Sequence, residues 1–312
     1  MKKTFRAPVV LLLCILLAAP ATAGDKLTLM LDWFPNVDHL PIYVAQEAGY
    51  FADQGIDVEI ISPSDTADGL KLAAAGTVDL AVSYEPQSVI AAAEGLEIRV
   101  VGRLVEHPLT TLLFLKEKGI QIPSDLAGKK IGYTVPGLMD VMLAAFAKVN
   151  GITDYSAVNV GFAIVPALVS GQVDAVMGPF KTYETVTMRH KGIAAAYFEL
   201  EKYGIPDYDE LVFVSGKKML SKKSAAIKAF IEAVGRGIVH VQADPKQALA
   251  MYFKALPDAD RKVETDAFEL TRPYFASSQT PDAVKWQAFA DFASTHRLIE
   301  KRVDVNRLIH RW

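Results

Sequence analysis

Short apolar runs of strand length alternate with helix-length segments from residue 27 to about residue 215 of this 312-residue chain. The runs that predict strands form two series: Leu27–Leu31, Asp57–Ser62, Leu80–Ser83, Arg99–Leu104 and Thr110–Leu115, then Lys130–Thr134, Asn159–Ala163, Ala175–Gly178, Ala195–Leu200 and Glu210–Ser215. Helices are predicted between them at Asp68–Ala75, Pro86–Glu94, Leu138–Asn150 and Ile164–Ser170, and others begin near Pro41 and Tyr183. This alternation is typical of α/β domains with parallel sheets. After residue 215 the chain is predicted to be a helical tail that packs back onto the domain formed by the first series.

The two series share a short repeat. The segment Gly76–Asp79, Gly-Thr-Val-Asp, matches Gly171–Asp174, Gly-Gln-Val-Asp, at an offset of 95 residues. A glycine that ends a helix before a buried strand is a common join, so the match alone is weak. Because it falls at the same point of both series, it predicts two equivalent lobes. The strand ends near Tyr84 and Phe180 are then expected to face each other across a cleft.

The first residues predict the compartment. Basic residues precede the apolar run Val9–Ala19, and Ala21–Ala23 supplies the small residues of a cleavage site, as in a secretory signal peptide over residues 1–23. The run is short for a membrane span. The single cysteine, Cys14, lies within it, so the mature chain is expected to carry no thiol. Leu13 before that cysteine argues against a lipid anchor, and we expect a periplasmic protein.

Composition excludes several classes of function. The 36 acidic and 33 basic residues give a net charge of −3, without the basic excess that nucleic acid requires. The six histidines are scattered, so no metal site is predicted. The chain contains neither a phosphate-binding glycine loop nor a nucleophile elbow. We therefore expect a binding protein without a cofactor rather than an enzyme.

A polar and aromatic segment follows the first predicted strand. Asp32-Trp-Phe-Pro-Asn36 comes directly after that strand and before the helix at Pro41. In open α/β sheets, ligands bind beyond the carboxyl ends of the strands. Trp33 and Asn36 are thus placed to contact a small molecule. An equally good interpretation is that Trp33 and Phe34 only cover the core.

Several motifs together resemble a known family. They are L-D-W-F-P-N at Leu31–Asn36, the run His39–Glu59, D-L-A-V-S at Asp79–Ser83 and L-A-G-K-K-I-G-Y at Leu126–Tyr133. Over essentially the whole mature chain they resemble the periplasmic substrate-binding proteins of ABC importers, above all the branch for pyrimidine precursors of thiamine. The long second motif is similar to that of nitrate, sulfonate and riboflavin binders. The chain is also similar to the yeast-type pyrimidine synthase.

The resemblance implies a two-lobed α/β fold, the type II periplasmic-binding-protein fold. Each lobe would contain one sheet, with the cleft between the lobes. Residues 24–107 and 216–312 are predicted to form lobe 1, and residues 108–215 lobe 2.

The chain departs from the synthase where that enzyme's chemistry resides. The synthase has a lysine for pyridoxal phosphate and a histidine that is consumed, and the matching positions here are Ser83 and Gln87. It also has a cysteine-rich iron site, whereas the mature chain contains no cysteine. Without the lysine amine no Schiff base forms. The enzyme alternative is therefore disfavoured, although other chemistry on the same fold stays open.

The candidate site follows from what an aminopyrimidine requires. An aromatic face would stack on the ring, and a carboxylate would accept from its amidine-like edge. We assign stacking to Trp33, with Tyr84 or Phe180 opposite. Glu184 resembles the carboxylate that holds the ring in pyrimidine-binding relatives, and Glu85 is the second choice. Glu184 also lies near a helix start, where an acid is favoured without any ligand.

Three further residues complete the predicted site. Tyr183 is either a lid residue or a packed surface aromatic. The loop at Pro136 and Gly137 carries backbone N–H groups at a helix start, which can hold an oxygen of a ligand. By contrast, His39 is expected to cap a helix or face solvent.

These features predict a monomeric solute-binding protein that closes its lobes over an aminopyrimidine of the formylaminopyrimidine or hydroxymethylpyrimidine type. Its partners would be the permease and ATPase of an ABC importer. The alternative ligands are riboflavin, or a sulfonate- or nitrate-type anion. An anion site calls for arginine or convergent backbone donors, and the motif segments contain no arginine.

Overall fold

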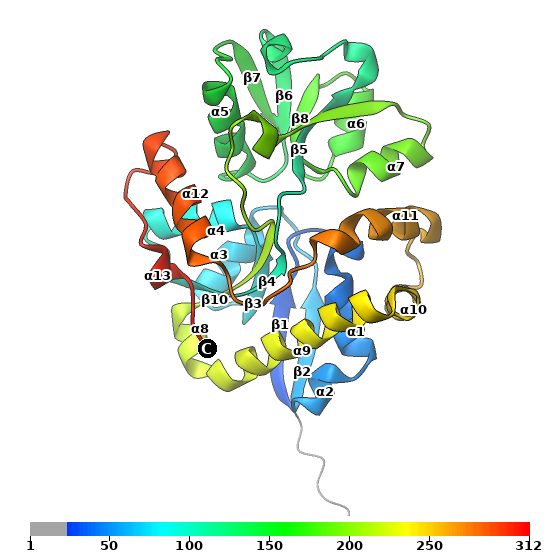
Figure 1. Ribbon diagram of the computed structural model, residues 1–312, viewed down its shortest axis with the longest axis vertical. Helices are drawn as coiled ribbons and strands as arrows, with labels where there is room; N and C mark the ends of the chain where they lie inside the picture. The colour runs from blue at the N-terminus through cyan, green and yellow to red at the C-terminus, as the bar shows by residue number, and fades with distance from the viewer. Residues whose placement is uncertain (1–23) are drawn as a thin grey trace, which may run out of the picture.

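The computed structural model describes residues 24–312 and contains two lobes, each built around a five-stranded sheet (Figure 1). The predicted signal peptide and Cys14 lie outside the described residues. The first sheet has the order β2-β1-β3-β10-β4. Its strands are β1 (Asp25–Met30), β2 (Ile56–Ile61), β3 (Leu80–Ser83), β4 (Ile98–Val105) and β10 (Leu211–Gly216). The two-lobed α/β fold is therefore as predicted.

The second sheet repeats this arrangement in the order β7-β6-β8-β5-β9. Its strands are β5 (Thr110–Leu115), β6 (Lys129–Tyr133), β7 (Tyr155–Asn159), β8 (Ala175–Phe180) and β9 (Ala195–Glu199). In both sheets three parallel strands lie beside an antiparallel strand that arrives from the other lobe, β10 in the first and β5 in the second. Strand β7 ends where the sequence predicted it to begin, because Tyr155–Asn159 is a half-exposed edge strand without a continuous apolar run.

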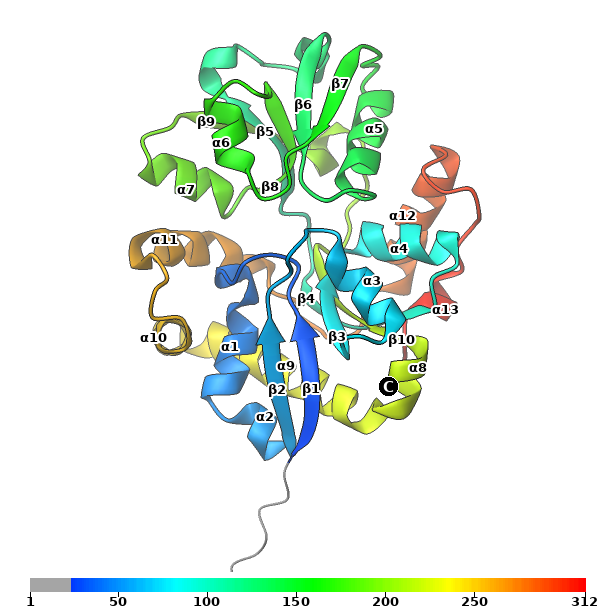
Figure 2. The same cartoon turned by 180° about the vertical axis from the view of Figure 1, so that it is seen from behind.

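Helices cover both faces of each sheet, as the rear view shows (Figure 2). In lobe 1 they are α1 (Leu40–Glu47), α2 (Tyr50–Asp53), α3 (Asp68–Ala75) and α4 (Glu85–Glu94). In lobe 2 they are α5 (Met139–Val149), α6 (Ile164–Val169) and α7 (Glu184–His190). The short 3₁₀ turns are Val37–His39, Lys116–Lys118, Pro123–Leu126, Leu200–Tyr203 and Arg272–Tyr274.

The internal repeat appears in the backbone as well as in the sequence. Gly76 ends α3 with φ +76°, and Gly171 follows α6 with φ +71°. The next strand begins in both lobes after an aspartate whose carboxylate accepts from the backbone of a neighbouring strand. Asp79 accepts from Thr28 N–H at 2.9 Å, and Asp174 accepts from Lys130 N–H at 3.0 Å. The two lobes therefore use the same join at equivalent positions.

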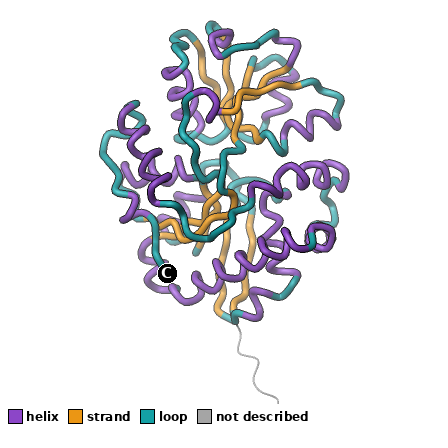
Figure 3. The backbone as a smooth tube through the Cα atoms, in the orientation of Figure 1, coloured by secondary structure: helices purple, strands orange, loops and turns teal. Residues whose placement is uncertain are grey.

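Two loop segments connect the lobes (Figure 3). The first leads from β4 to β5, and the second leads from β9 to β10. Strand β10 pairs with β3 and β4, so it belongs to the first sheet, although the predicted lobe 2 extended to residue 215. The prediction misplaced it because a buried apolar strand carries no signal for the sheet that it joins. Glu210 fixes this crossing by accepting from Leu109 N–H at 2.5 Å and Thr110 N–H at 2.7 Å.

The C-terminal tail is helical and covers lobe 1. It consists of α8 (Lys217–Lys222), α9 (Ser224–Ala243), α10 (Pro245–Ala255), α11 (Arg261–Thr271), α12 (Ala283–Thr295) and α13 (Val305–Leu308). The long helix α9 packs on α1 and α2, while α11 also touches α7 of lobe 2. None of the helices within residues 24–312 has the length and apolar character needed to cross a bilayer.

Candidate functional site

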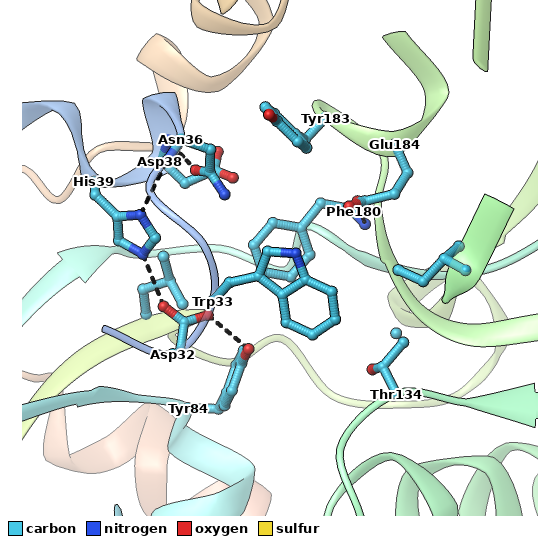
Figure 4. A pocket seen from close by; sticks show the side chains of 13 residues that line it. Asp32, Trp33, Asn36, Asp38, His39, Tyr84, Thr134, Phe180, Tyr183 and Glu184 are labelled. Atoms are coloured by element: carbon cyan, nitrogen blue, oxygen red, sulfur yellow. Dashed lines mark hydrogen bonds and ion pairs between the residues drawn. The ribbon is translucent and has the colours of Figure 1, made fainter. Parts of the chain in front are cut away.

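A pocket lies between the lobes, at the carboxyl ends of β1, β3, β6 and β8 (Figure 4). Lobe 1 and the incoming strand β10 contribute Asp32, Trp33, Asn36, Asp38, His39, Tyr84 and Leu211. Lobe 2 contributes Thr134, Ile164, Gly178, Phe180, Tyr183 and Glu184. The free volume is about 20 Å³. Since this is room for about one water, an aromatic ligand can enter only after the lobes or the aromatic side chains move apart.

A rigid turn forms the lobe 1 side of the pocket. Asn36 Oδ1 accepts from Asp38 N–H at 2.8 Å, and the side chain of His39 reaches back to the backbone of Asn36. With Nδ1 facing that N–H, the other ring nitrogen donates to Asp32 Oδ1 at 2.8 Å. Asp32 Oδ2 in turn accepts from the Tyr84 hydroxyl at 2.7 Å. These contacts leave the amide nitrogen of Asn36 turned toward the pocket.

Glu184 is the acidic group of the lobe 2 side. It is the first residue of α7, and its Oε2 accepts from Phe180 N–H at 2.7 Å. Burial raises the pKa of Glu184 to about 7. The hydrogen bond from Phe180 lowers this pKa, and the charge of Asp32 raises it. The carboxyl group is therefore positioned by the backbone at the wall of the pocket.

Asp38 is a second acid on the opposite wall. Its side chain is almost completely buried, and Oδ1 accepts from the Thr271 hydroxyl at 2.8 Å. Oδ2 has no hydrogen-bond partner among residues 24–312. Burial raises the pKa of Asp38 to about 7. The neighbouring His39 lowers this pKa, whereas the charges of Glu184 and Asp32 raise it.

The electrostatics of the pocket favour one class of ligand. Three carboxyl groups and one histidine line it, and none of its lining residues in the described chain is Lys or Arg. The nearby Lys181 is already paired with Glu199 and Glu201, at 3.1 and 2.9 Å. The pocket is thus suited to a ligand with hydrogen-bond donors or positive charge, and an anion would meet repulsion.

Side-chain contacts across the cleft hold the lobes together on one side of the pocket. Tyr183 of lobe 2 donates to Glu264 Oε1 on α11 at 2.7 Å. The other oxygen of Glu264 accepts from Val37 N–H at 3.0 Å. Arg189 and His190 pair with Asp266 at 3.0 and 2.9 Å. Glu264 therefore links the position of lobe 2 to the turn that carries Asn36 and Asp38.

Aromatic contacts join the lobes elsewhere. Phe162 lies in the loop before α6. The centroid of its ring is 4.6 Å from that of Trp33 and 4.5 Å from that of Phe34. Trp33 also packs against the apolar cluster of lobe 2. Phe34 is 51% exposed, so it covers the edge of the pocket and does not line it.

The structure brings together six of the nine predicted site residues. They are Trp33, Asn36, Tyr84, Phe180, Tyr183 and Glu184. Pro136 and Gly137 do not line the pocket, and Gly137 N–H already donates to Asp140 Oδ1 at 2.7 Å. The predicted oxygen site at that loop is therefore filled by the chain itself.

Glu85 also lies outside the pocket. It is fully buried, and its Oε2 accepts from Asp209 N–H at 2.7 Å beside the second crossing between the lobes. Burial, with the neighbouring charge of Asp209, raises the pKa of Glu85 well above its usual value. Its position at the start of α4 turns it toward the crossing, where its carboxyl group holds the backbone of Asp209.

Sequence reasoning missed several residues of the pocket, namely Asp32, Asp38, His39, Thr134, Ile164, Gly178 and Leu211. His39 caps the turn as expected but is buried rather than solvated. Gly178 has φ +126°, and a Cβ there would lie 2.0 Å from Thr134 Oγ1. Asp32 and Asp38 stand within the polar segment after β1, so that segment contained the signal for them.

The buried acids predict how stability depends on pH. Asp38 and Glu184 titrate near pH 7 in the folded chain and near pH 4 when unfolded. Between these values the folded state binds more protons, so the free energy of unfolding should fall as pH rises. We expect the ligand-free protein to lose about 2–4 kcal/mol between pH 5 and pH 8 in urea titrations.

The double variant Asp38→Asn/Glu184→Gln is the control for this effect. It should make the profile less steep, leaving the shares of Glu85, Glu210 and Glu264, whose pKa values burial also raises. A wild-type protein that gains stability from pH 5 to pH 8 would contradict the assignment.

Comparisons with known proteins identify the family of the chain. The model of a family described as NMT1/THI5 like matches residues 36–248. A putative thiamine biosynthesis protein of Haemophilus influenzae is 38% identical over 294 residues, covering 92% of each chain. The formylaminopyrimidine-binding protein of Halalkalibacterium halodurans is 31% identical, covering 96% of each.

Other similarities point to the fold and to an enzyme branch. The alkanesulfonate-binding protein of Xanthomonas axonopodis pv. citri superposes with a TM-score of 0.73 at 17% identity, covering 93% of this chain and 99% of its own. A 4-amino-5-hydroxymethyl-2-methylpyrimidine phosphate synthase of Legionella pneumophila is 25% identical, covering 93% of this chain and 92% of its own.

Proposed function

The chain belongs to the NMT1/THI5-like family, and from that premise we propose that it is the periplasmic solute-binding component of an ABC importer for a pyrimidine precursor of thiamine. Its periplasmic-binding-protein fold and its relatives support a solute-binding role. The single observation that carries the choice of ligand is the position of Glu184 in a closed pocket without a cation. A carboxyl group fixed by Phe180 N–H at the wall of the pocket would accept from the donor edge of an aminopyrimidine.

The pocket can accommodate both the face and the edge of such a ring. Trp33 and Tyr84 of lobe 1 and Phe180 of lobe 2 supply aromatic rings to the lining (Figure 4). Stacking on an aromatic side chain contributes about 0.5–1.5 kcal/mol beyond the area buried. The edge contact with Glu184 then selects for donors, since a ligand without them would leave a buried carboxylate unpaired.

The alternative ligands fit less well. A sulfonate or nitrate would stand among Asp32, Asp38 and Glu184 with no lining Lys or Arg to bind it. Riboflavin is a much larger ligand, and a pocket with about 20 Å³ of free volume would have to open far wider for it. The structural similarity to sulfonate and nitrate binders, at 17% and 16% identity, is a similarity of fold.

The synthase alternative lacks its reactive group. The resemblance to the synthase implies that Ser83 and Gln87 stand where that enzyme has its lysine and histidine, and Ser83 Oγ donates to Gln87 Oε1 at 2.7 Å. Neither side chain offers an amine for a Schiff base. Binding without covalent chemistry is the function that these residues support.

A thermal-shift panel tests the proposal. The protein without residues 1–23 is melted with 4-amino-5-hydroxymethyl-2-methylpyrimidine, its formylaminomethyl analogue, riboflavin, taurine and nitrate. A ligand at 100 times its dissociation constant adds about 2.7 kcal/mol to the free energy of unfolding. For a chain of this size that shift is several degrees. We expect it for the pyrimidines alone; a shift with taurine, nitrate or riboflavin and none with the pyrimidines would reject the proposal.

Closure of the lobes over a ligand would create the surface that the importer recognises. A ligand held by both walls stabilises the closed form, since only that form contacts it from both sides. The joined lobe surfaces would then bind a permease that works with an ATPase. Genes for a permease and an ATPase beside this gene would support import, and their absence would favour the enzyme alternative.

A further inference from the structure

One buried carboxylate oxygen of a pocket residue accepts no hydrogen bond from the described protein. Asp38 is 1% exposed, and its Oδ2 has no partner among residues 24–312. Buried polar atoms in native proteins nearly always have a partner, so this oxygen requires an explanation. It belongs to a residue that lines the pocket and faces its interior (Figure 4).

The surrounding contacts prevent the protein from satisfying this oxygen. Asp38 Oδ1 is held by Thr271, and the backbone N–H of Asp38 donates to Asn36. The His39 ring points to Asp32. The adjacent Val37 N–H is bound to Glu264. The carboxyl group therefore cannot turn to another donor without breaking the turn.

The charges around Asp38 identify the missing partner. The groups that face it are His39, Asp32, Glu184, the Thr271 hydroxyl and the Tyr183 hydroxyl. Acids outnumber bases here, and the charge of Glu184 acts unfavourably on an ionised Asp38. A cation at this place satisfies the oxygen and relieves the repulsion. A neutral donor would satisfy the oxygen without relieving the repulsion, and a neutral acceptor would require Asp38 to keep its proton.

We propose that Asp38 Oδ2 binds a primary ammonium substituent of the ligand, so that the preferred ligand is an aminopyrimidine with a free aminomethyl group. This inference rests on the proposed function and makes its ligand more specific. Glu184 then holds the donor edge of the ring from lobe 2, and Asp38 holds the ammonium group from lobe 1. Ligand binding thereby adds a charge pair across the cleft, which favours closure.

Acylation of the ligand amine weakens the interaction. A formyl group removes the positive charge and leaves one neutral N–H where the ammonium group had three, so the charge pair with Asp38 is lost. The chain should therefore prefer the free amine to the formylated form. The ligand differs by this one acyl group from the one in the name of the relative from Halalkalibacterium halodurans.

The test compares two probes on two proteins. The probes are 4-amino-5-aminomethyl-2-methylpyrimidine and its N-formyl derivative, titrated calorimetrically into wild type and Asp38→Asn at pH 7.5. Wild type should bind the amine at least about tenfold more tightly than the formamide. Asp38→Asn should weaken amine binding by about 10- to 100-fold. Its amide can donate to a formyl carbonyl, so formamide binding should stay within about threefold of wild type.

Controls separate this inference from the proposed function. The exposed Asp258→Asn is the matched variant and should leave both affinities unchanged. Formamide binding by Asp38→Asn reports a folded site, and the wild-type preference is informative even if that variant does not fold. Equal or tighter binding of the formamide by wild type, or an equal loss for both probes in Asp38→Asn, would overturn the role of Asp38. Failure of wild type to bind either probe while 4-amino-5-hydroxymethyl-2-methylpyrimidine binds would also overturn the role of Asp38, and failure with all three compounds would instead reject the proposed function.

Discussion

Glu184→Gln should weaken binding of 4-amino-5-hydroxymethyl-2-methylpyrimidine by about 30- to 1000-fold, which corresponds to about 2–4 kcal/mol. The structure explains why an isosteric change has so large an effect. Phe180 N–H lies 2.7 Å from the carboxyl group and requires an acceptor. The glutamine would keep its oxygen on Phe180, so its NH₂ group would face the pocket. Two donors would then oppose each other in a dry cleft.

The matched control is Glu85→Gln, which changes a buried glutamate of the other lobe in the same way. Glu85 does not line the pocket, so its substitution should leave the dissociation constant within about threefold of wild type. Melting curves of both variants show whether the fold is intact. If Glu184→Gln binds within about threefold of wild type, Glu184 is not the carboxylate that holds the ring. If Glu85→Gln shows the loss, the carboxylate comes from lobe 1.

Trp33→Ala should lower the affinity for the same ligand by about 5- to 150-fold, as expected when an aromatic stacking partner of a base is removed. The indole lies in the middle of the pocket and contacts Phe162 of the opposite lobe at 4.6 Å. It is outside the alternating core of the first sheet, and we expect the fold to persist. Isothermal titration and melting curves measure the two effects separately.

Two substitutions make the tryptophan result specific. Trp33→Phe retains an aromatic face and should recover most of the affinity. Trp312→Ala removes a 42% exposed tryptophan whose indole donates to Val101 O in β4, so it should not change binding. A large loss of stability in Trp33→Ala with unchanged affinity would show that Trp33 belongs to the core.

Most of the fold could be predicted because local signals coincide with the element boundaries. The predicted bounds of α3, β3 and β5 match the structure. Helix α3 ends at a glycine with positive φ, and β3 and β5 are fully buried. The sheet membership of β10 could not be predicted in this way, since it depends on pairing with residues more than 100 positions earlier.

The site was predictable only as far as its aromatic residues, Asn36 and Glu184. The roles of Asp32 and Asp38 depend on partners distant in sequence: Tyr84 for the first and Thr271 for the second. Glu85 stands beside Tyr84 in the sequence, but its side chain points to Asp209 at the crossing. Proximity along the chain therefore identified the edge of the pocket and could not tell which acid faces it.

The most direct test is calorimetric titration of the protein without residues 1–23 with 4-amino-5-hydroxymethyl-2-methylpyrimidine and with its 4-oxo analogue. The two ligands differ at the edge that Glu184 would read. A site built around a ligand donor discriminates strongly against an analogue that lacks it, so we expect one-to-one binding of the amino compound and at least about 100-fold weaker binding of the oxo compound. Equal affinities would contradict the role of the carboxylate. No binding of either compound, together with tight binding of taurine or nitrate, would contradict the assignment of this chain as an aminopyrimidine-binding protein.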